Sequence, residues 1–576
     1  MKIMRTEYPR PQFCRPAWRN LNGEWDFEFD FGDSGEARGL AEKEYSQKIN
    51  VPFCPESKLS GIKYTDFMNA VWYRRTFKLT KDELSGRILL HFGAVDYEAT
   101  VWLNGEKVGM HKGGYVSFAL ELTKFAKEGE NTLVVRARDD NRRTRQPRGK
   151  QSELYASHGC DYTRTTGIWQ TVWLEFLPDT YMTGVRVFTN YKNGAVSIEI
   201  SIDGCKKDLS ARVTASLEGK TIDFTEQPCT GTVTRLDFTV ENPKLWAPGS
   251  PTLYDVKYEL IRAGKVIDTA DGYFGIRTIE SRGHGLYLNG KPLFMRTVLD
   301  QGFWPDGVYT APTDEALRRD IELAQAIGFN GARLHQRVFE ERWLYWADKM
   351  GYIVWGEHAN WGMDHTSRGI GIFLPEWLEI MRRDFSHPAI IGWCPFNETW
   401  DRNGTRQDDD LLRVVYLATK AYDPTRPCID TSGNYHVITD LYDIHDYDQR
   451  KAVYDERYRS KKYDDLYENY TDRQKKNGTP FWISEFGGAR WAPGRNDGWG
   501  YGDAPRSDME VAERFDFLTA AMQSSPDIVG YCYTQMTDIE QEQNGLYAYD
   551  RSKKLCDEAY EIIRKANLRI SEFEKC

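Results

Sequence analysis

The chain has 576 residues, 40% of them hydrophobic and 28% charged, which is typical of a soluble globular protein with three or four domains. Its formal net charge of −10 excludes a main role in binding nucleic-acid backbones, because the chain has no basic surplus to displace counterions. A cluster of basic residues, "DDNRRTRQPRGK" at 139–150, is therefore interpreted as a solvated loop.

The sequence also excludes a membrane span, because it contains no run of 18 apolar residues. The N-terminal residues lack the apolar core of a signal peptide. The ten cysteines form no C-x-x-C pair, which favours a reducing compartment and leaves no ligand set for a structural metal. We therefore expect a cytoplasmic protein without a bound metal.

Residues 1–180 show the alternation of apolar and polar residues that is typical of β-strands. Clear examples lie at 70–79, 87–109 and 131–139, and "LNGEKVG" contains the Asn-Gly pair of a tight hairpin. We predict a jelly-roll sandwich here. Residues 181–274 repeat the β pattern with a new spacing and six or seven strands, which predicts an immunoglobulin-like sandwich.

From residue 275 to 576, strands alternate with helices. The clearest helical patterns are 313–328 and 339–351, and both end in glycine. This alternation predicts a (β/α)8 TIM barrel. An open doubly wound sheet is the alternative, but no Gly-rich phosphate loop follows any strand. The predicted barrel strands are 292–299, 330–335, 352–357, 390–398, 427–432, 441–447, 481–486 and 528–535.

Polar side chains close most of these strands, and the C-terminal strand ends form the active-site face of such barrels. Two of them, Glu398 and Glu485, end the fourth and seventh strands. Two carboxylates that face one sugar bond can hydrolyse it without metal or cofactor, one as a proton donor and the other ionised. The apolar stretch "WCPF" before Glu398 is expected to raise its pKa, as a proton donor requires. For a retaining enzyme the carboxyl groups should lie about 5–5.5 Å apart.

Three motifs make the chain similar to glycoside hydrolase family 2, which includes β-galactosidases, β-glucuronidases and β-mannosidases. "NGARLHQRVFEERWLYWADKMGYIVW" (330–355) resembles the long family signature, through Asn330, Arg333, Asp348 and Gly351. "HPAIIGWCPFNE" (387–398) resembles the acid/base motif, and "SEFG" (484–487) resembles the nucleophile motif. The order of the three predicted domains also agrees with the family.

The resemblance implies roles for particular residues. Glu398 would be the acid/base and Glu485 the nucleophile of a double displacement, with no cofactor. Asn397 would bind the sugar 2-hydroxyl, Arg333 would hold Glu485 ionised, and Tyr447 would donate to it. In the first domain, Asp161 within 160–175 would contact a sugar hydroxyl, or else be a turn residue. His445 and Gln535 also end strands and complete the predicted substrate-binding set.

Departures from the family leave the sugar open. The family's His-Tyr-Pro after the strand-2 arginine is replaced by Gln336, Arg337 and Val338, so Gln336 or His335 would bind a hydroxyl. Arg337 would bind a substrate carboxylate, or pair with Glu340, Glu341 or Glu357. Uronate-cleaving members carry Asn-x-Lys near the last strand, whereas Asn544 here has no lysine two residues on. Arg490 is a further candidate cation.

The favoured hypothesis is a retaining exo-β-glycosidase that acts on terminal β-D-galactosides or on a related sugar such as α-L-arabinopyranose. The alternative enzyme is a β-D-uronidase, either a glucuronidase or a galacturonidase, that uses Arg337 or Arg490. A non-catalytic carbohydrate-binding protein is the alternative of another class. The expected partner is a carbohydrate substrate; nucleic acid and membrane are not expected, and a homo-oligomer is left open.

Overall fold

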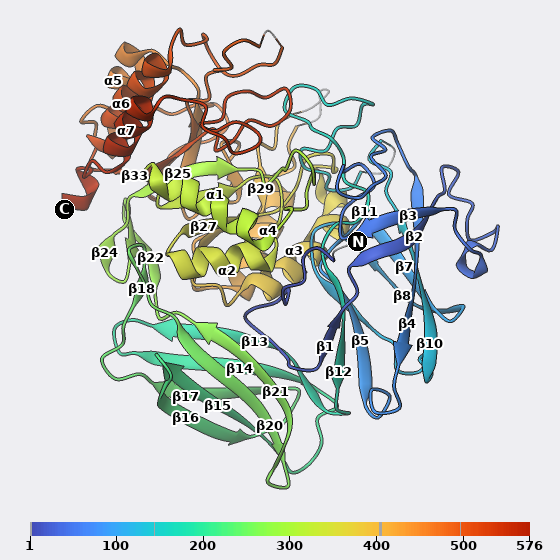
Figure 1. Ribbon diagram of the computed structural model, residues 1–576. Helices are drawn as coiled ribbons and strands as arrows, with labels where there is room; N and C mark the ends of the chain where they lie inside the picture. The colour runs from blue at the N-terminus through green and yellow to red at the C-terminus, as the bar shows by residue number, and fades with distance from the viewer. Residues whose placement is uncertain (1–2, 143–144, 402–405, 496, 576) are drawn as a thin grey trace.

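The computed structural model describes residues 3–142, 145–401, 406–495 and 497–575. Figure 1 shows two β-sandwiches beside a larger α/β domain: the first sandwich in blue, the second in green, and the α/β domain from yellow-green to red. The multidomain architecture predicted from the sequence is therefore present. No helix in the described ranges is long and apolar enough to cross a bilayer.

The first sandwich consists of a four-stranded sheet, in the order β1-β12-β5-β9, and a six-stranded sheet, in the order β3-β2-β4-β10-β7-β8. Alternate side chains such as Trp25 and Phe27 fill the space between the sheets, as the period-two pattern requires. The hairpin between β7 and β8 turns at Asn104 and Gly105, which both adopt positive φ. The strands are β1 (Trp18–Asn20), β2 (Gly23–Phe29), β3 (Gln47–Val51), β4 (Ala70–Leu79), β5 (Arg87–Phe92), β6 (Val95–Asp96), β7 (Glu98–Leu103), β8 (Glu106–Lys112), β9 (Phe118–Glu121), β10 (Gly129–Arg138), β11 (Gly167–Ile168) and β12 (Val172–Leu177).

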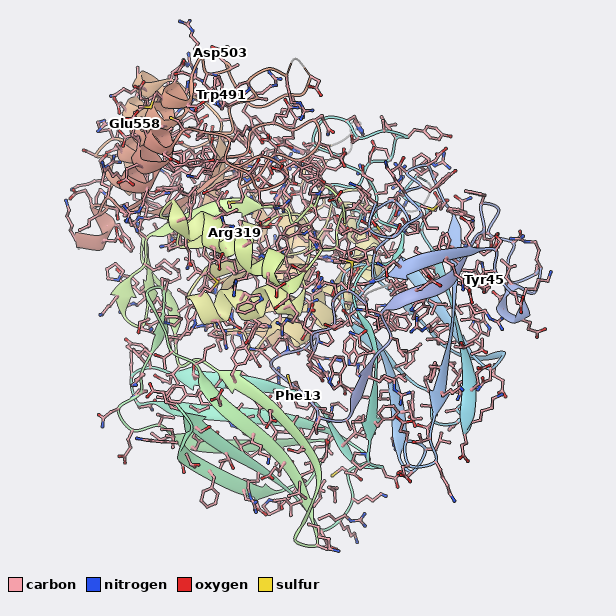
Figure 2. The ribbon with its side chains drawn as sticks, viewed as in Figure 1. Phe13, Tyr45, Arg319, Trp491, Asp503 and Glu558 are labelled. Atoms are coloured by element: carbon pink, nitrogen blue, oxygen red, sulfur yellow. The ribbon has the colours of Figure 1, made fainter. Side chains whose placement is uncertain are left out.

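The second sandwich pairs a three-stranded sheet, β13-β14-β17, with a four-stranded sheet, β16-β15-β20-β21. In β14 every second residue is buried, so one face of the strand lies in the core. Phe13 of the N-terminal segment is also buried in this core (Figure 2). The strands are β13 (Tyr181–Asn190), β14 (Ala195–Asp203), β15 (Leu209–Leu217), β16 (Lys220–Pro228), β17 (Val233–Thr239), β18 (Trp246–Ala247), β19 (Ser250–Pro251), β20 (Tyr254–Arg262) and β21 (Lys265–Phe274).

The third domain is a parallel barrel, preceded by a small antiparallel sheet that the sequence did not indicate. Its main sheet has the order β28-β27-β26-β25-β33-β32-β31, and the parallel pair β29-β30 fills the gap between β28 and β31. The predicted strand 390–398 is interrupted at Pro395, which has no N–H to donate. The strands are β22 (Ile279–Arg282), β23 (Gly285–Leu288), β24 (Lys291–Pro292), β25 (Met295–Asp300), β26 (Gly331–Leu334), β27 (Ile353–Glu357), β28 (Ile390–Cys394), β29 (Phe396–Asn397), β30 (Thr431–Ser432), β31 (Tyr442–Asp446), β32 (Phe481–Phe486) and β33 (Ile528–Tyr533).

Helices pack around the barrel strands, with ends that follow the sequence signals. Thr313 caps α1 by accepting a hydrogen bond from the amide of Ala316, and Gly351 ends α2 in the left-handed conformation. The α-helices are α1 (Asp314–Ala326), α2 (Glu341–Met350), α3 (Ile370–Asp384), α4 (Asp409–Tyr422), α5 (Lys451–Tyr458), α6 (Asp508–Gln523) and α7 (Asp557–Asn567), and the 3-10 turns are Leu40–Glu42, Ser367–Gly369, Tyr463–Asp465 and Phe573–Lys575.

Candidate active site

Arg333, at the end of β26, is fully buried and connects three other strand ends of the barrel. Its Nε donates to Glu357 Oε2 at 2.8 Å, and its Nη1 donates to Glu485 Oε1 at 2.6 Å. Its Nη2 donates to the side-chain oxygen of Asn397. A planar guanidinium with several donors suits this geometry, which fixes two carboxylates and an amide around one centre.

Glu485, on β32, also accepts a hydrogen bond from the Tyr447 hydroxyl. Burial favours the neutral acid, but the positive charges of His445 and Arg333 outweigh it and hold the pKa of Glu485 below its usual value. Glu485 is therefore a buried, ionised carboxylate whose two oxygens both have donors.

Glu398 directly follows β29 and has a left-handed backbone, with φ of 48°. Its Oε1 lies 2.7 Å from Nδ1 of His445. Burial raises the pKa of Glu398, as expected, but the hydrogen bond and charge of His445 outweigh burial and leave this pKa below its usual value. The expectation of a raised pKa was therefore wrong, because the sequence could not reveal the imidazole facing Glu398.

His445, near the end of β31, lies between the two carboxylates. Its Nε2 is 3.5 Å from Glu485 Oε1 and 3.1 Å from the Ser432 hydroxyl. Burial lowers the pKa of His445, but the two carboxylates raise it above its usual value overall. One oxygen of Glu398 and one of Glu485 lie within 4.8 Å of each other. This close approach of single oxygens is compatible with the separation of about 5–5.5 Å between carboxyl groups that is typical of retaining glycosidases.

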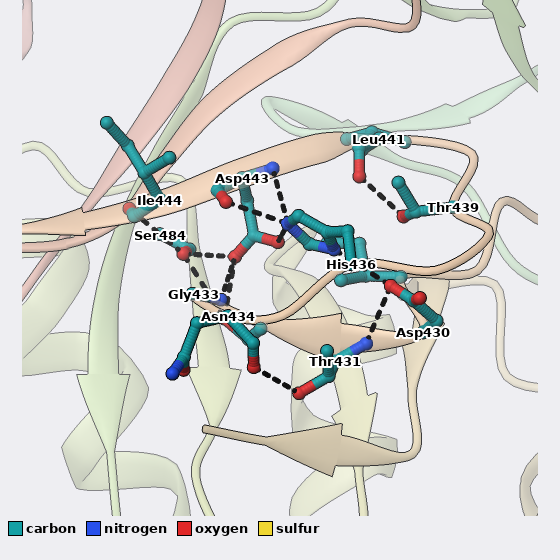
Figure 3. Close-up of polar contacts among 12 residues, drawn as sticks. Asp430, Thr431, Gly433, Asn434, His436, Thr439, Leu441, Asp443, Ile444 and Ser484 are labelled. Carbon is teal, nitrogen blue, oxygen red and sulfur yellow. Dashed lines mark hydrogen bonds and ion pairs between the residues drawn. The ribbon is translucent and has the colours of Figure 1, made fainter. Parts of the chain in front are cut away.

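A polar network around Asp443 lies next to His445, and its contacts with Ser484 and Gly433 are drawn in Figure 3. Asp443 Oδ2 accepts from the Ser432 hydroxyl at 2.7 Å, from the Ser484 hydroxyl, and from the Gly433 amide at 3.2 Å. Ser432 therefore connects Asp443 to the imidazole of His445. The network orients the ring that contacts both carboxylates.

Asn397 has the free donor that a sugar-binding amide needs. Its side-chain oxygen accepts from Arg333, and its Nδ2 is buried without a hydrogen-bond partner among the described residues. A buried amide without a partner is costly, so this N–H group is available for a substrate hydroxyl.

Of the two residues that follow β26, His335 lies in the candidate site and Gln336 supports a neighbouring loop. His335 remains in the site, 3.2 Å from Glu357 Oε1, and burial holds its pKa well below the usual value, so that it is neutral. Gln336 has positive φ, and its side chain exchanges hydrogen bonds with Asn360. The Gln336 amide therefore supports the neighbouring loop at Asn360.

Arg337 does not take either of the roles considered for it. It donates to the backbone carbonyls of Gly302 and Tyr309, and its guanidinium lies 4.9 Å from the Trp169 ring centroid. It forms no ion pair with an acid within the described ranges. Arg337 therefore joins the first sandwich to the barrel, and the suggestion that it binds a carboxylate is not supported.

Gln535 and Arg490 are also engaged with protein groups. The Gln535 amide accepts from Gln301 at 2.6 Å and donates to Asn544 at 2.8 Å. Arg490 donates to the carbonyls of Arg495 and Asp497 at 2.7 and 2.8 Å. Both side chains are thus held by neighbouring protein groups, and the Nε of Arg490 is buried without a partner among the described residues.

The first sandwich contributes to the site through the loop that contains Asp161. Asp161 accepts from Arg148 at 2.9 Å, and its backbone pairs with His158 in a turn. Nearby, the Tyr162 hydroxyl donates to Glu542, and the Thr163 amide donates to Glu540 at 3.2 Å. This loop therefore packs against the segment that follows the last barrel strand.

Sequence reasoning missed the residues at 146–150, which it treated as part of a solvated loop. They are buried between the first sandwich and the barrel, whereas 143–144 lie outside the described residues. The amides of Arg148 and Gly149 donate to the Trp361 carbonyl, at 2.9 and 3.2 Å. Lys150 comes with them, its Nζ 4.0 Å from the Trp361 ring centroid. A basic cluster in an acidic chain was the signal that could have revealed this segment.

Comparison with known families matches each domain in turn. Residues 45–170 match the glycosyl hydrolase 2 galactose-binding domain-like description, 180–277 match glycosyl hydrolases family 2, and 279–500 match the family 2 TIM barrel domain. Together these matches cover most of the chain, in the order predicted from the sequence.

Individual relatives divide between two activities. A putative beta-glucuronidase of Formosa agariphila is 26% identical over 510 residues, which is 84% of this chain and 58% of that protein. A beta-galactosidase of Thermoanaerobacter pseudethanolicus is 28% identical over 380 residues, 63% of this chain and 49% of that protein. The chain thus spans about half the length of these relatives. The b-glucuronidase of Ruminococcus gnavus in complex with D-glucuronic acid has the same fold, with a TM-score of 0.79, 19% identity, and coverage of 97% of this chain and 99% of that one.

Proposed function

Because the chain belongs to glycosyl hydrolase family 2, we propose that it is a retaining exo-β-glycosidase that removes a terminal sugar by double displacement. The observation that carries this proposal is the approach of the Glu398 and Glu485 oxygens to within 4.8 Å, around one buried arginine. Such a close approach suits a carboxylate that attacks the sugar directly.

In the first step, ionised Glu485 attacks the anomeric carbon while the bond to the leaving oxygen breaks. The leaving oxygen needs one proton, and the Glu398–His445 pair holds one. Because the pKa of Glu398 is lowered and that of His445 is raised, this proton rests on the imidazole. His445 passes it to Glu398 across their 2.7 Å contact, and Glu398 donates it to the leaving oxygen. In the second step, water gives a proton to Glu398 and displaces Glu485 from the sugar.

Exo action is supported by the wall that the first sandwich adds to the site. The loop at 159–163 bonds to the segment 540–542, through the side chain of Tyr162 and the backbone of Thr163. A wall on one side of the two carboxylates suits a pocket for a chain end better than an open groove.

Two sugars remain as candidates, and each has an observation in its favour. A neutral galactoside-type sugar is favoured by Leu546. This residue is buried and apolar, and it stands where the uronate-cleaving members carry the lysine of Asn-x-Lys. A uronide is favoured by Lys150, a buried ammonium near Glu398. The aryl β-galactoside, β-glucuronide, β-galacturonide and α-L-arabinopyranoside, assayed side by side, would identify the sugar.

The nucleophile assignment is tested with Glu485→Gly and added azide. The variant should lose activity by about a thousandfold or more, since the covalent step disappears. Azide, entering the space of the lost carboxylate, should restore turnover and give the α-glycosyl azide from a β-glycoside. A variant with near-normal activity and no azide product would contradict the assignment. The matched change Glu56→Gly, at a buried glutamate of the first sandwich, should give no azide product.

A further inference from the structure

Lys150 is a buried lysine that the proposed mechanism leaves unexplained. Its side chain is only slightly accessible, at 6% of the residue's surface. The chain around it is tightly fixed: Gly149 has φ of 58°, and a Cβ there would lie 2.3 Å from the Gln336 carbonyl oxygen. The Lys150 carbonyl accepts from the Tyr162 amide at 2.7 Å. The packing of the backbone on both sides of Lys150 therefore fixes the position of this residue at the barrel face.

The ammonium points into the active site. It lies over the ring of Trp361, and the indole N–H of Trp361 donates to the Asn397 carbonyl at 3.2 Å. Its charge acts on Glu398, and on His335 at the end of β26. Lys150 is thus next to the residues that would hold the sugar.

Among the described residues, the Lys150 ammonium donates no hydrogen bond and has no carboxylate oxygen within 4.0 Å. It lies over the Trp361 ring instead. The neighbouring acids already have donors of their own. Glu542 accepts from Asn544 at 2.9 Å and from Tyr162, whereas Asp161 accepts from Arg148. Glu398 accepts from His445.

A buried ammonium without a hydrogen-bond acceptor is unfavourable unless a ligand or ordered water supplies one. Burial lowers the pKa of Lys150, but Cys160 and the carboxylates of Glu542, Glu398 and Asp161 raise it overall, so the group keeps its charge. A contact with an aromatic face returns only part of the lost solvation. The site is therefore prepared for an acceptor that arrives with the substrate.

On the basis of the proposed function, we propose that Lys150 binds the carboxylate of a terminal uronic acid, and that β-uronides are the substrates. A carboxylate forms the short, charge-assisted hydrogen bonds that an ammonium lacks here. A phosphate or sulfate ester fits less well. The negative charges of Glu542, Glu398 and Asp161 act on this ammonium, and they would repel a more highly charged anion more strongly than a single carboxylate.

The test compares kcat/KM for the 4-nitrophenyl β-D-glucuronide, β-D-galacturonide and β-D-galactoside. The wild-type enzyme should prefer one of the uronides, and Lys150→Met should lower the ratio of uronide to galactoside kcat/KM by about a hundredfold or more. Lys150→Arg should keep part of the ratio, since the charge remains. The exposed Lys107 supplies the matched control, and Lys107→Met should leave the ratio unchanged.

Two outcomes would overturn the proposal. One is a wild-type enzyme that prefers the galactoside and has the same ratio of uronide to galactoside kcat/KM as Lys150→Met. The glycosidase function would then stand, but the proposed role of Lys150 would be wrong. The other is a wild-type enzyme that hydrolyses none of the three, which would contradict the proposed function itself.

Binding measurements guard against a variant that merely folds poorly. In the Glu485→Gln background, calorimetric titration should show D-glucuronate or D-galacturonate binding at least about tenfold more tightly than D-galactose. Lys150→Met in the same background should remove that difference while circular dichroism stays unchanged. Equal affinities for the acid and the neutral sugar in the protein that retains Lys150 would overturn the proposal.

Discussion

His445 is the residue that governs the protonation of the site. It contacts Glu398, the proposed acid/base, at 2.7 Å and approaches Glu485 at 3.5 Å, so one imidazolium balances two carboxylates. Removing it would leave the two carboxylates facing each other, with only Arg333 and Lys150 as neighbouring positive charges. In the proposed mechanism the imidazole therefore both stores the proton for the leaving group and reduces the repulsion between two acids.

This geometry predicts a pH effect for His445→Gln. In the wild-type enzyme the alkaline limb of kcat/KM reports loss of the proton held by the Glu398–His445 pair, and the raised pKa of His445 places that loss above the usual histidine range. In the variant only a carboxyl can hold the proton, and carboxyls lose protons at lower pH than imidazoliums. The alkaline limb should therefore move to lower pH, and initial rates from pH 4 to 10 would measure it.

An unchanged alkaline limb in His445→Gln would mean that Glu398 holds the proton alone. His111, on β8 of the first sandwich, provides the control. His111→Gln should leave the pH profile as it is in the wild-type enzyme, because that ring contacts Glu379, far along α3 from the strand ends.

The same residues show what a sequence can reveal at this scale. Glu398 and Glu485 were predictable, since each closes an apolar strand and barrel strand ends meet at one face. Arg333 and Arg337 could not be separated by pattern alone. The backbone turns at Gln336, where φ is 53°, and sends Arg337 away from the site. The basic cluster at 139–150 could have drawn attention to Lys150, but its position beside Trp361 depends on how two domains pack.

At the scale of elements, the loop between β30 and β31 is held by His436 (Figure 3). Its Nδ1 lies 2.8 Å from Asp430 Oδ1, and its Nε2 lies 3.2 Å from Asp443 Oδ1. Asp430 also accepts from the amides of Val437 and Ile438, at 2.6 and 3.0 Å. This buried cluster closes the barrel where β30 contributes only two residues, and it positions Asp443 below His445.

The cluster predicts a pH-dependent stability. Burial opposes the charge of His436, but Asp430 and Asp443 outweigh burial and raise its pKa from 6.5 to about 10. A raised pKa contributes stability that is complete below pH 6.5 and is lost as the pH rises toward 10. At about 1.4 kcal/mol per pKa unit, the contribution is on the order of a few kcal/mol.

His436→Asn should therefore melt well below the wild-type protein at pH 6, and the difference should narrow as the pH approaches 10. Differential scanning calorimetry at several pH values would measure it. A difference that stays constant with pH would show that packing, and not charge, is what His436 provides. His284 is exposed, and His284→Asn should change the melting temperature little at either pH.

Element boundaries were harder to predict than element types. The predicted fourth strand continued through Pro395, but the missing N–H ends β28 there and starts the separate β29. The predicted fifth strand, 427–432, shortens to Thr431–Ser432 because Cys428 pairs with Trp393 only through an isolated bridge. The helices 313–328 and 339–351 were found nearly as predicted, because residues such as Thr313 and Gly351 mark their ends in the sequence.

For the whole molecule, the domains share buried side chains, and the active site is completed only when they pack together. Arg15 of the N-terminal segment bonds to Glu175 of the first sandwich at 3.1 Å and to Asp268 of the second at 2.8 Å. Arg5 joins the same segment to Glu340 beside the barrel, at 2.7 Å. The segment at 148–150 reaches the barrel through Trp361 in the same way, so the proposed role of Lys150 depends on how the domains pack.

Asp348, near the end of α2, holds the second sandwich against the barrel. It is fully buried, and its carboxylate accepts from the Tyr273 hydroxyl and from the Ala389 amide, both at 2.8 Å, and contacts Nδ1 of His387. Its backbone oxygen accepts from Trp246 at 2.7 Å. One side chain thus joins β21, α2 and the start of β28, on the face of the barrel opposite the catalytic residues.

Asp348→Ala should consequently destabilise the protein by about 3–5 kcal/mol, because it leaves three buried donors without an acceptor. Asp348→Asn keeps the shape and one acceptor, so its loss should be smaller. Both variants should keep the wild-type kcat at temperatures where they are folded, since contacts on the N-terminal face of a barrel serve stability and not chemistry. Urea unfolding followed by tryptophan fluorescence, alongside kcat, measures both effects. A fall in kcat without a fall in stability would contradict this separation, and the exposed Asp557 gives the control, since Asp557→Ala should alter neither.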